Sequence, residues 1–193
     1  MHELKTPLMK GKFLLELPNN DSNKHKMSEV FSRLELLISE FAGIEELMNT
    51  SNEDKILQTD NYHIQDLIEN AIDLLMKDEN IEVDESLNKI YNVNFKLFSI
   101  VIKNLIDNAL KYSTNTKVQI ISKDDNLTFK NRGEKLQYQL EEYFQPFFNN
   151  SNNTNNSFGL GLYIVDYILR AHNMRLEYKH EKGYNYFSIH DIH

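Results

Sequence analysis

The sequence contains no cysteine and no tryptophan among its 193 residues. Disulfides, cysteine-ligated zinc and thiol catalysis are therefore excluded, and the composition suits a reducing cytoplasm. Basic residues are the minority, with 21 Lys and Arg against 29 Asp and Glu and a formal charge of −8. An extended basic surface for a phosphate backbone is not expected, so we predict no direct nucleic-acid partner.

Long hydrophobic runs are lacking as well. A membrane span needs roughly 18 apolar residues, and even the run from Leu97 to Ile106 is interrupted by Ser99, Lys103 and Asn104. No signal peptide is recognisable. The length, with 40% hydrophobic residues, allows one ordinary domain or two small ones with a buried core.

The first 50 residues predict a helical hairpin. Apolar residues recur at alternating spacings of 3 and 4 between Met27 and Met48, a period of 3.5 that favours the supercoiled packing of a four-helix bundle. A shorter helix is predicted from His2 to Leu17, and Pro18 to Asp21 should form the turn. Either a second copy completes the bundle as a homodimer, or the hairpin packs on the rest of its own chain.

A polar stretch at 51–58 predicts a linker, and residues 59–193 predict a separate α+β domain. Helix-like and strand-like patterns alternate there, which indicates helices on one face of a mixed sheet. The predicted helices are 65–76, 94–112 and 159–172, and the predicted strands are 62–64, 81–83, 89–93, 117–122, 127–131, 175–180 and 185–190. Six of the eight residues in 149–156 are Asn, which predicts a mobile loop.

Three polar residues interrupt the apolar pattern of the helix predicted at 94–112. Asn104, Asn108 and Lys111 are spaced i, i+4, i+7 and so share one face. Asn is less favourable than Ala inside a helix by about half a kcal/mol, so helix stability does not account for this row. Two amides and a cation suit a phosphate with its metal ion, although the row could equally be the solvated side of an amphipathic helix.

Glycine is scarce, with 6 in the whole chain, yet Gly159 and Gly161 both stand at the start of one predicted helix. Glycine lets the backbone approach a ligand closely, and the free N–H groups at a helix start favour an anion such as a triphosphate.

At the other end of the chain, His2 and Thr6 share a helix face above Pro7. A neutral His can attack phosphorus, and an adjacent carboxylate, here Glu3, can take its proton.

These segments together resemble the histidine protein kinases of two-component signalling. Residues 2–7 (HELKTP) match the phosphoacceptor box, 104–112 (NLIDNALKY) the asparagine box, 143–147 (YFQPF) the phenylalanine box and 159–162 (GLGL) the second glycine box. The resemblance covers nearly the whole chain. It implies a dimerisation and phosphotransfer hairpin followed by a GHKL, or Bergerat-type, ATP-binding α/β sandwich.

The resemblance also implies roles for individual residues. His2 would be phosphorylated, Glu3 would deprotonate it, and Thr6 would position water in the reverse, phosphatase reaction. Asn108 and Asn104 would hold Mg²⁺. The remaining residues implied in binding ATP are Lys111, Tyr112, Asn131, Gly133, Phe147, Gly159, Leu160, Gly161 and Leu162.

The first glycine box, aligned on 127–136, departs from the family pattern. Asn131 stands where the family has an adenine-reading Asp, and Lys135 replaces a second Gly. An amide oxygen still accepts a hydrogen bond but without charge assistance, so we expect ATP affinity several-fold weaker. The alternative is that Asn131 simply ends a strand. The Asn-rich loop also lacks the basic residue usual there.

The implied function is the cytoplasmic catalytic core of a sensor histidine kinase, which autophosphorylates His2 from ATP and passes the phosphoryl group to an aspartate of a response regulator. The alternative is a phosphatase-biased or non-catalytic signalling module with weakened ATP binding. Because His2 is the second residue, we expect a fragment in which His2 is frayed and poorly phosphorylated, derived from a membrane-anchored parent.

Overall fold

The computed structural model describes residues 23–24, 26–27, 58–75, 80–123, 126–146, 148 and 159–192. The chain divides into two units, Met1–Glu46 and Leu47–His193. In the first, Asn23, Lys24, Lys26 and Met27 are described and are helical. The rest of the predicted hairpin, and with it the homodimer, lies outside the described residues and stays a prediction, as do the linker and the Asn-rich loop.

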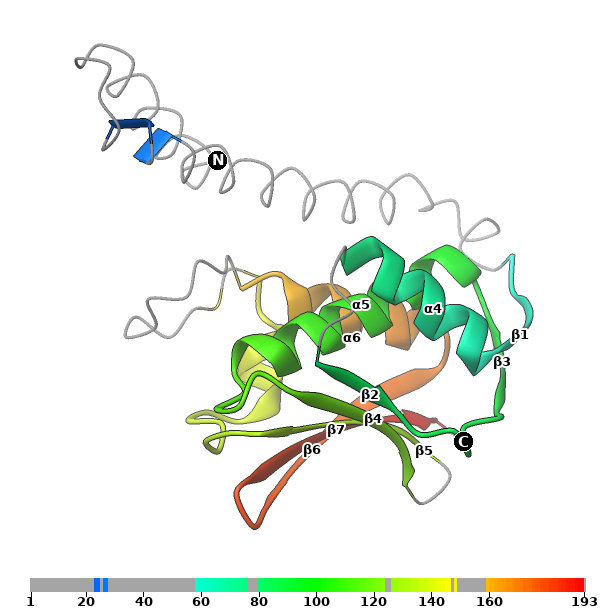
Figure 1. Ribbon diagram of the computed structural model, residues 1–193. Helices are drawn as coiled ribbons and strands as arrows, with labels where there is room; N and C mark the ends of the chain where they lie inside the picture. The colour runs from blue at the N-terminus through cyan, green and yellow to red at the C-terminus, as the bar shows by residue number, and fades with distance from the viewer. Residues whose placement is uncertain are drawn as a thin grey trace. The chain divides into compact units, whose positions relative to one another are not determined.

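The second unit has two layers, with helices covering one face of a β-sheet (Figure 1). The helices are α4 (Ile64–Leu75), α5 (Phe95–Lys111) and α6 (Gly161–Ala171), and a short 3-10 helix, η1, spans Leu140–Phe144. The strands are β1 (Asp60–His63), β2 (Ile81–Val83), β3 (Ile90–Val93), β4 (Val118–Lys123), β5 (Asn126–Arg132), β6 (Met174–Glu181) and β7 (Tyr184–Asp191). The α+β prediction is confirmed for this unit.

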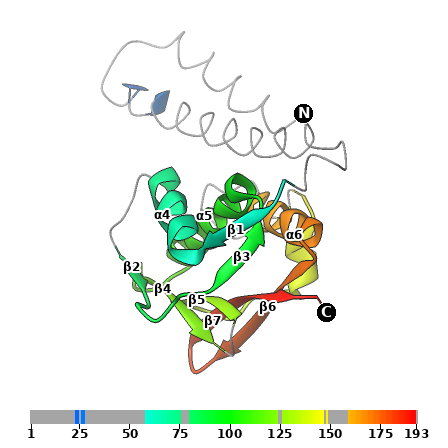
Figure 2. The ribbon, with the colours of Figure 1, turned by 90° about the vertical axis from the view of Figure 1, so that its right-hand side faces the viewer.

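The main sheet has the strand order β2-β4-β5-β7-β6, with β2 parallel to β4 and every other neighbouring pair antiparallel. This sheet is mixed, as predicted, but it does not contain every strand. β1 and β3 pair only with each other, antiparallel, as a small second sheet. Each leads directly into a helix, β1 into α4 and β3 into α5, so this pair lies beside the helix starts (Figure 2).

Helix α5 is central to the helical layer, because it contacts α4, α6 and strands β4 and β5. Its start is fixed by Asn94, whose side-chain oxygen accepts a hydrogen bond from the Leu97 N–H at 3.1 Å. Such a cap satisfies one of the free donors at a helix start. The helix buries the apolar stripe Leu97, Phe98, Val101, Ile102, Leu105, Ile106 and Ala109. The polar row of α5 is thereby turned away from the core.

His172 joins the end of α6 to the start of α5. Its Nε2 accepts a hydrogen bond from the Asn94 N–H at 3.0 Å, and its Nδ1 lies 2.8 Å from the Ile168 carbonyl oxygen. This pair of partners requires the neutral ring with its proton on Nδ1. Burial lowers the pKa of His172, an effect opposed by the hydrogen bond to Ile168. The ring therefore acts as an uncharged connection between the two helices.

The predicted helices and strands of the second unit are confirmed, with ends shifted by at most two residues. The 3-10 helix η1 was not predicted, since its five residues are too few to show periodicity. Its start is capped reciprocally by Gln139 and Glu142. In the part of the chain that the structure describes, no helix combines the length and apolarity required to cross a bilayer.

Candidate functional site

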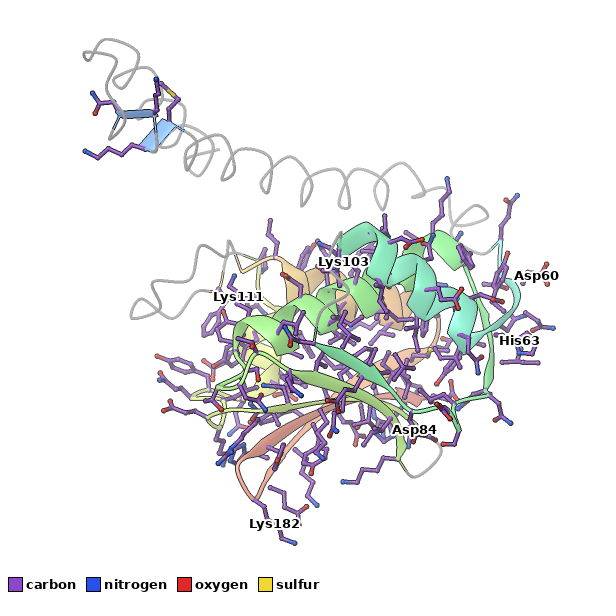
Figure 3. All side chains as sticks on the ribbon, viewed as in Figure 1. Asp60, His63, Asp84, Lys103, Lys111 and Lys182 are labelled. Carbon is purple, nitrogen blue, oxygen red and sulfur yellow. The ribbon has the colours of Figure 1, made fainter. Side chains whose placement is uncertain are left out.

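The polar row predicted on α5 lies where the sequence places it. Asn104, Asn108 and Lys111 are all half-buried and lie outside the apolar stripe. Lys111, labelled at the end of α5 in Figure 3, has its Nζ 5.9 Å from the ring centroid of Tyr112. Amide oxygens are hard ligands that suit Mg²⁺.

The start of α6 lies directly against this row. A Cβ atom placed on Gly161, the first residue of α6, would be 3.7 Å from the Asn104 side-chain oxygen. Leu160, the N-cap, is buried and has no side-chain acceptor for the first N–H groups of the helix. The half-buried Leu162 follows in the first turn. The structure thus brings the asparagine box and the second glycine box together, with uncapped helix donors that favour an anion.

The two glycines of this segment are held differently. Gly159 has a φ of +69°, and a Cβ there would lie 2.3 Å from the Phe148 carbonyl oxygen. Both the backbone conformation and the space therefore require glycine. Gly161 has only an ordinary van der Waals contact at 3.7 Å. The fold needs Gly159, whereas nothing among the described residues demands glycine at position 161.

The first glycine box lies at the other end of the α5 row. A Cβ on Gly133 would lie 2.7 Å from the Tyr112 carbonyl oxygen, 2.9 Å from Asn185 Nδ2 and 3.2 Å from Asn131 Nδ2. Gly133 is therefore packed closely against these three polar atoms, and we call this group the Gly133 cradle. The eight residue-to-residue steps from Asn104 to Tyr112 correspond to about 12 Å at 1.5 Å per residue. The two glycine boxes flank this length of α5, which suits an elongated ligand such as a nucleoside triphosphate.

Asn131 has an unsatisfied donor in this cradle. The residue is 2% exposed, and its Nδ2 is buried with no hydrogen-bond partner. An unpaired buried donor costs about 1–3 kcal/mol, so such atoms are rare and ask for an explanation. The interpretation that Asn131 only ends a strand does not supply one. A purine base, which presents both donors and acceptors at its edge, fits this residue.

A polar network beside Asn131 was missed by the sequence reasoning. Asn185 pairs with Asn131 across β5 and β7 and is 3% exposed. Its Oδ1 accepts from the Tyr178 hydroxyl at 2.7 Å and lies 2.9 Å from His180 Nδ1, while its Nδ2 donates to the Glu134 carbonyl at 3.0 Å. The alternation in β7 could have shown it, because an Asn at 185 shares the inward face of Phe187 and Ile189.

This network holds the segment that follows the first glycine box. The Tyr178 hydroxyl also accepts from the Leu136 N–H at 3.0 Å. Burial raises the pKa of Tyr178, and the donor at Leu136 acts against that rise. The Gly133 N–H donates to the Gly183 carbonyl at 3.1 Å. Residues 133–136 are therefore fixed to the β6–β7 hairpin, which keeps the cradle in place.

A metal ion would depend on the asparagine row and on its ligand. No group of three His, Cys, Asp or Glu side chains that could hold a metal occurs within the described residues. Mg²⁺ is commonly bound by one or two protein oxygens together with substrate phosphates. The amide oxygens of Asn104 and Asn108 fit that mode, and they lie beside the predicted phosphate-binding helix start.

A groove of about 660 Å³ lies between η1 and α6, lined in part by Gln145, Pro146, Tyr163 and Tyr167. Gln145 and Pro146 belong to the phenylalanine box, but none of the predicted site residues lines the groove.

Four predicted site residues, His2, Glu3, Thr6 and Phe147, lie outside the described residues. The other ten are on α5, the end of β5 with its following loop, and the start of α6.

Comparison with known proteins agrees with this arrangement. Residues 93–190 match the family described as histidine kinase-, DNA gyrase B- and HSP90-like ATPase. The chain is 37% identical over 198 residues to the sensor histidine kinase ArsS of Helicobacter pylori, covering 99% of this chain and 45% of ArsS. It is 25% identical to the sensor protein kinase GraS of Staphylococcus aureus, covering 86% of this chain and 51% of GraS. The chain thus spans about half the length of these two relatives.

Solved structures share the fold. The histidine kinase AdeS of Acinetobacter baumannii aligns with a TM-score of 0.68 at 18% identity, covering 97% of this chain and 95% of that one. The nucleotide-free catalytic domain of the histidine kinase ThkA aligns with a TM-score of 0.57 at 21% identity, covering 68% and 93% of the two chains. The chain therefore belongs to the sensor histidine kinases, and its residues 93–190 form an ATPase domain of the type found in histidine kinases, DNA gyrase B and HSP90.

Proposed function

We propose that this chain is the catalytic core of a sensor histidine kinase that binds Mg-ATP along α5, transfers the γ-phosphoryl group to His2 and then passes it to an aspartate of a response regulator. The observation that supports this most is the position of the α5 asparagine row. It lies between the start of α6, next to Asn104, and the Gly133 cradle, next to Tyr112. One face of a single helix therefore offers a phosphate end and a base end.

The residues of the chain would divide the work by position. The N–H groups at the start of α6, together with Lys111, would bind the phosphates, and the amides of Asn104 and Asn108 would hold the cation. Bound Mg²⁺ would neutralise charge on the phosphate oxygens. Phosphoryl transfer requires little covalent work from the protein, so alignment and charge stabilisation supply most of the catalysis.

At the acceptor, the neutral imidazole of His2 would form an N–P bond while the bond between the γ-phosphorus and the ADP oxygen breaks. Glu3 would take the imidazole proton, and ADP would leave. In the proposed homodimer the hairpin would present this His2 to the ATP of its own or the partner subunit. A receiver aspartate would then accept the phosphoryl group, and in the reverse mode Thr6 would position the water that hydrolyses the receiver aspartyl phosphate.

The experiment is to measure Mg-ATP binding by calorimetry and ³²P transfer from γ-labelled ATP. We expect wild-type chain to bind, Asn108→Ala to lose most binding and all labelling, and His2→Ala to bind normally but stay unlabelled. Asn92→Ala is a matched control, because Asn92 is exposed on β3 in the separate small sheet. Normal Mg-ATP binding by Asn108→Ala would contradict the proposal.

A second candidate function rests on the altered first glycine box. Asn131 and Lys135 favour a phosphatase-biased or non-catalytic module in which ATP binding is weakened. In that case Mg-ATP at millimolar concentration neither binds nor labels His2, even in a chain extended upstream, while the hairpin still binds a receiver domain. A dissociation constant for Mg-ATP in the micromolar range would support the kinase over this second candidate.

A further inference from the structure

The two asparagines that pair across β5 and β7 differ in how the protein holds them. Asn185 has one fixed orientation. Its Oδ1 accepts from the hydroxyl of Tyr178, which itself accepts from the Leu136 N–H. Its Nδ2 donates to the Glu134 carbonyl. Exchanging the oxygen and nitrogen of Asn185 would break both bonds, so this amide cannot turn without cost.

Asn131 has no such constraint on its nitrogen. The Nδ2 atom is buried without a hydrogen-bond partner, and it lies on the same side of Gly133 as the Nδ2 of Asn185, another donor. Rotating the terminal amide by about 180° exchanges oxygen and nitrogen at little steric expense, because the two groups are nearly the same size.

An amide that can turn recognises two kinds of base edge. A carboxylate offers acceptors only, so an Asp at this position would favour the 6-amino group of adenine and repel the 6-oxo group of guanine or hypoxanthine. Asn131 offers its oxygen to a 6-amino group or its NH₂ to a 6-oxo group. The adjacent ring nitrogen N1 is an acceptor in a 6-aminopurine and carries a proton in a 6-oxopurine. A bridging water can donate to N1 in the first base or accept from it in the second.

Building on the proposed nucleotide site, we infer that the base cradle of this chain accepts 6-oxopurine as well as 6-aminopurine nucleoside triphosphates. The specificity-determining residue is Asn131, with Asn185 as a positioning residue that keeps the neighbouring face of the cradle fixed. Gly133 packs so closely against the Tyr112 carbonyl and both asparagine side chains that no side chain fits between them.

The test compares Mg-ATP with Mg-ITP, whose base differs from adenine only at position 6 and in the proton on N1. Calorimetric titration of wild-type chain should give dissociation constants within about tenfold of each other. In Asn131→Asp the ratio should rise by about 10- to 100-fold in favour of ATP, the size of discrimination that one well-placed polar pair provides. Thermal melting confirms that the variant is folded.

Asn115→Asp is the matched control for the added charge. Asn115 is exposed, and its Oδ1 accepts from the Ser113 hydroxyl at 2.6 Å, which a carboxylate would also do. This variant should keep the wild-type ratio. Wild-type chain that binds Mg-ATP but prefers it to Mg-ITP by 100-fold or more overturns the inference and leaves the proposed function intact. Wild-type chain that binds neither nucleotide overturns both.

Discussion

Replacing Gly161 with Ala separates what the fold needs from what the ligand needs. Among the described residues, the added Cβ would meet only the Asn104 side-chain oxygen, at 3.7 Å, and Gly161 opens α6 without a positive φ. Alanine is better than glycine in a helix by about 1 kcal/mol and also restricts the unfolded chain. Because the position is at the helix end, we expect a gain of about 0.5–1 kcal/mol in the free energy of unfolding, or roughly 1–4 °C in the melting midpoint.

The same methyl group should damage nucleotide binding. It would project toward the place where the phosphates approach Asn104 and the first N–H groups of α6. A misfit of this kind in a binding site is expected to weaken Mg-ATP by about 10-fold or more, equal to about 1.4 kcal/mol. The prediction is thus a variant that is more stable without nucleotide and poorer at binding it.

The assay measures Mg-ATP affinity by calorimetry and the melting midpoint by thermal denaturation for wild type, Gly161→Ala and Gly159→Ala. Gly159→Ala is the contrasting case, since its Cβ would lie 2.3 Å from the Phe148 carbonyl oxygen at a φ of +69°, so we expect it to lose stability with or without nucleotide. Two results would refute the reasoning. One is a loss of more than about 1 kcal/mol in Gly161→Ala, and the other is wild-type affinity for Mg-ATP in that variant.

Two further predictions concern the supports of the site. Burial lowers the pKa of His172 from 6.5. The folded state should therefore be at full stability above pH 6.5 and lose stability as the pH falls below 6.5 toward the lowered pKa. Melting midpoints measured from pH 7.5 to 5 should show this loss, and His172→Gln should make the melting midpoint depend less on pH. Tyr178→Phe removes the hydroxyl between Leu136 and Asn185. This change should lower the free energy of unfolding by about 1–3 kcal/mol and speed hydrogen exchange at the Leu136 amide. Unchanged exchange at Leu136 would show that the hydroxyl does not hold that segment.

The helices and strands of the second unit were predictable because their patterns are long. The helix predicted at 94–112 is observed as α5, Phe95–Lys111, since its apolar stripe repeats over four turns and Asn94 caps it. The separation of β1 and β3 from the main sheet was not predictable. Four-residue strands give a period but no indication of their partner, which is decided by the helices that follow them.

The site was predicted in part for the same reason. Asn104, Asn108 and Gly161 belong to contiguous motifs, so the sequence showed which residues to group, although not that Asn104 lies next to Gly161. The network of Tyr178, His180 and Asn185 has no local signature, because these side chains are on two strands and their other partners are backbone groups. Such contacts form only when the sheet aligns β6, β7 and the loop after β5.

The unsatisfied nitrogen of Asn131 links stability to ligand binding. The ligand-free chain carries a buried donor without an acceptor, a penalty of about 1–3 kcal/mol that a core residue chosen for stability alone would avoid. A base that supplies the acceptor removes this penalty only in the folded state. Ligand binding to the folded state raises stability by about 2.7 kcal/mol at 100 times the dissociation constant. Because the described residues give this donor no acceptor and the start of α6 no side-chain cap, we expect bound nucleotide to raise the melting midpoint of the folded chain.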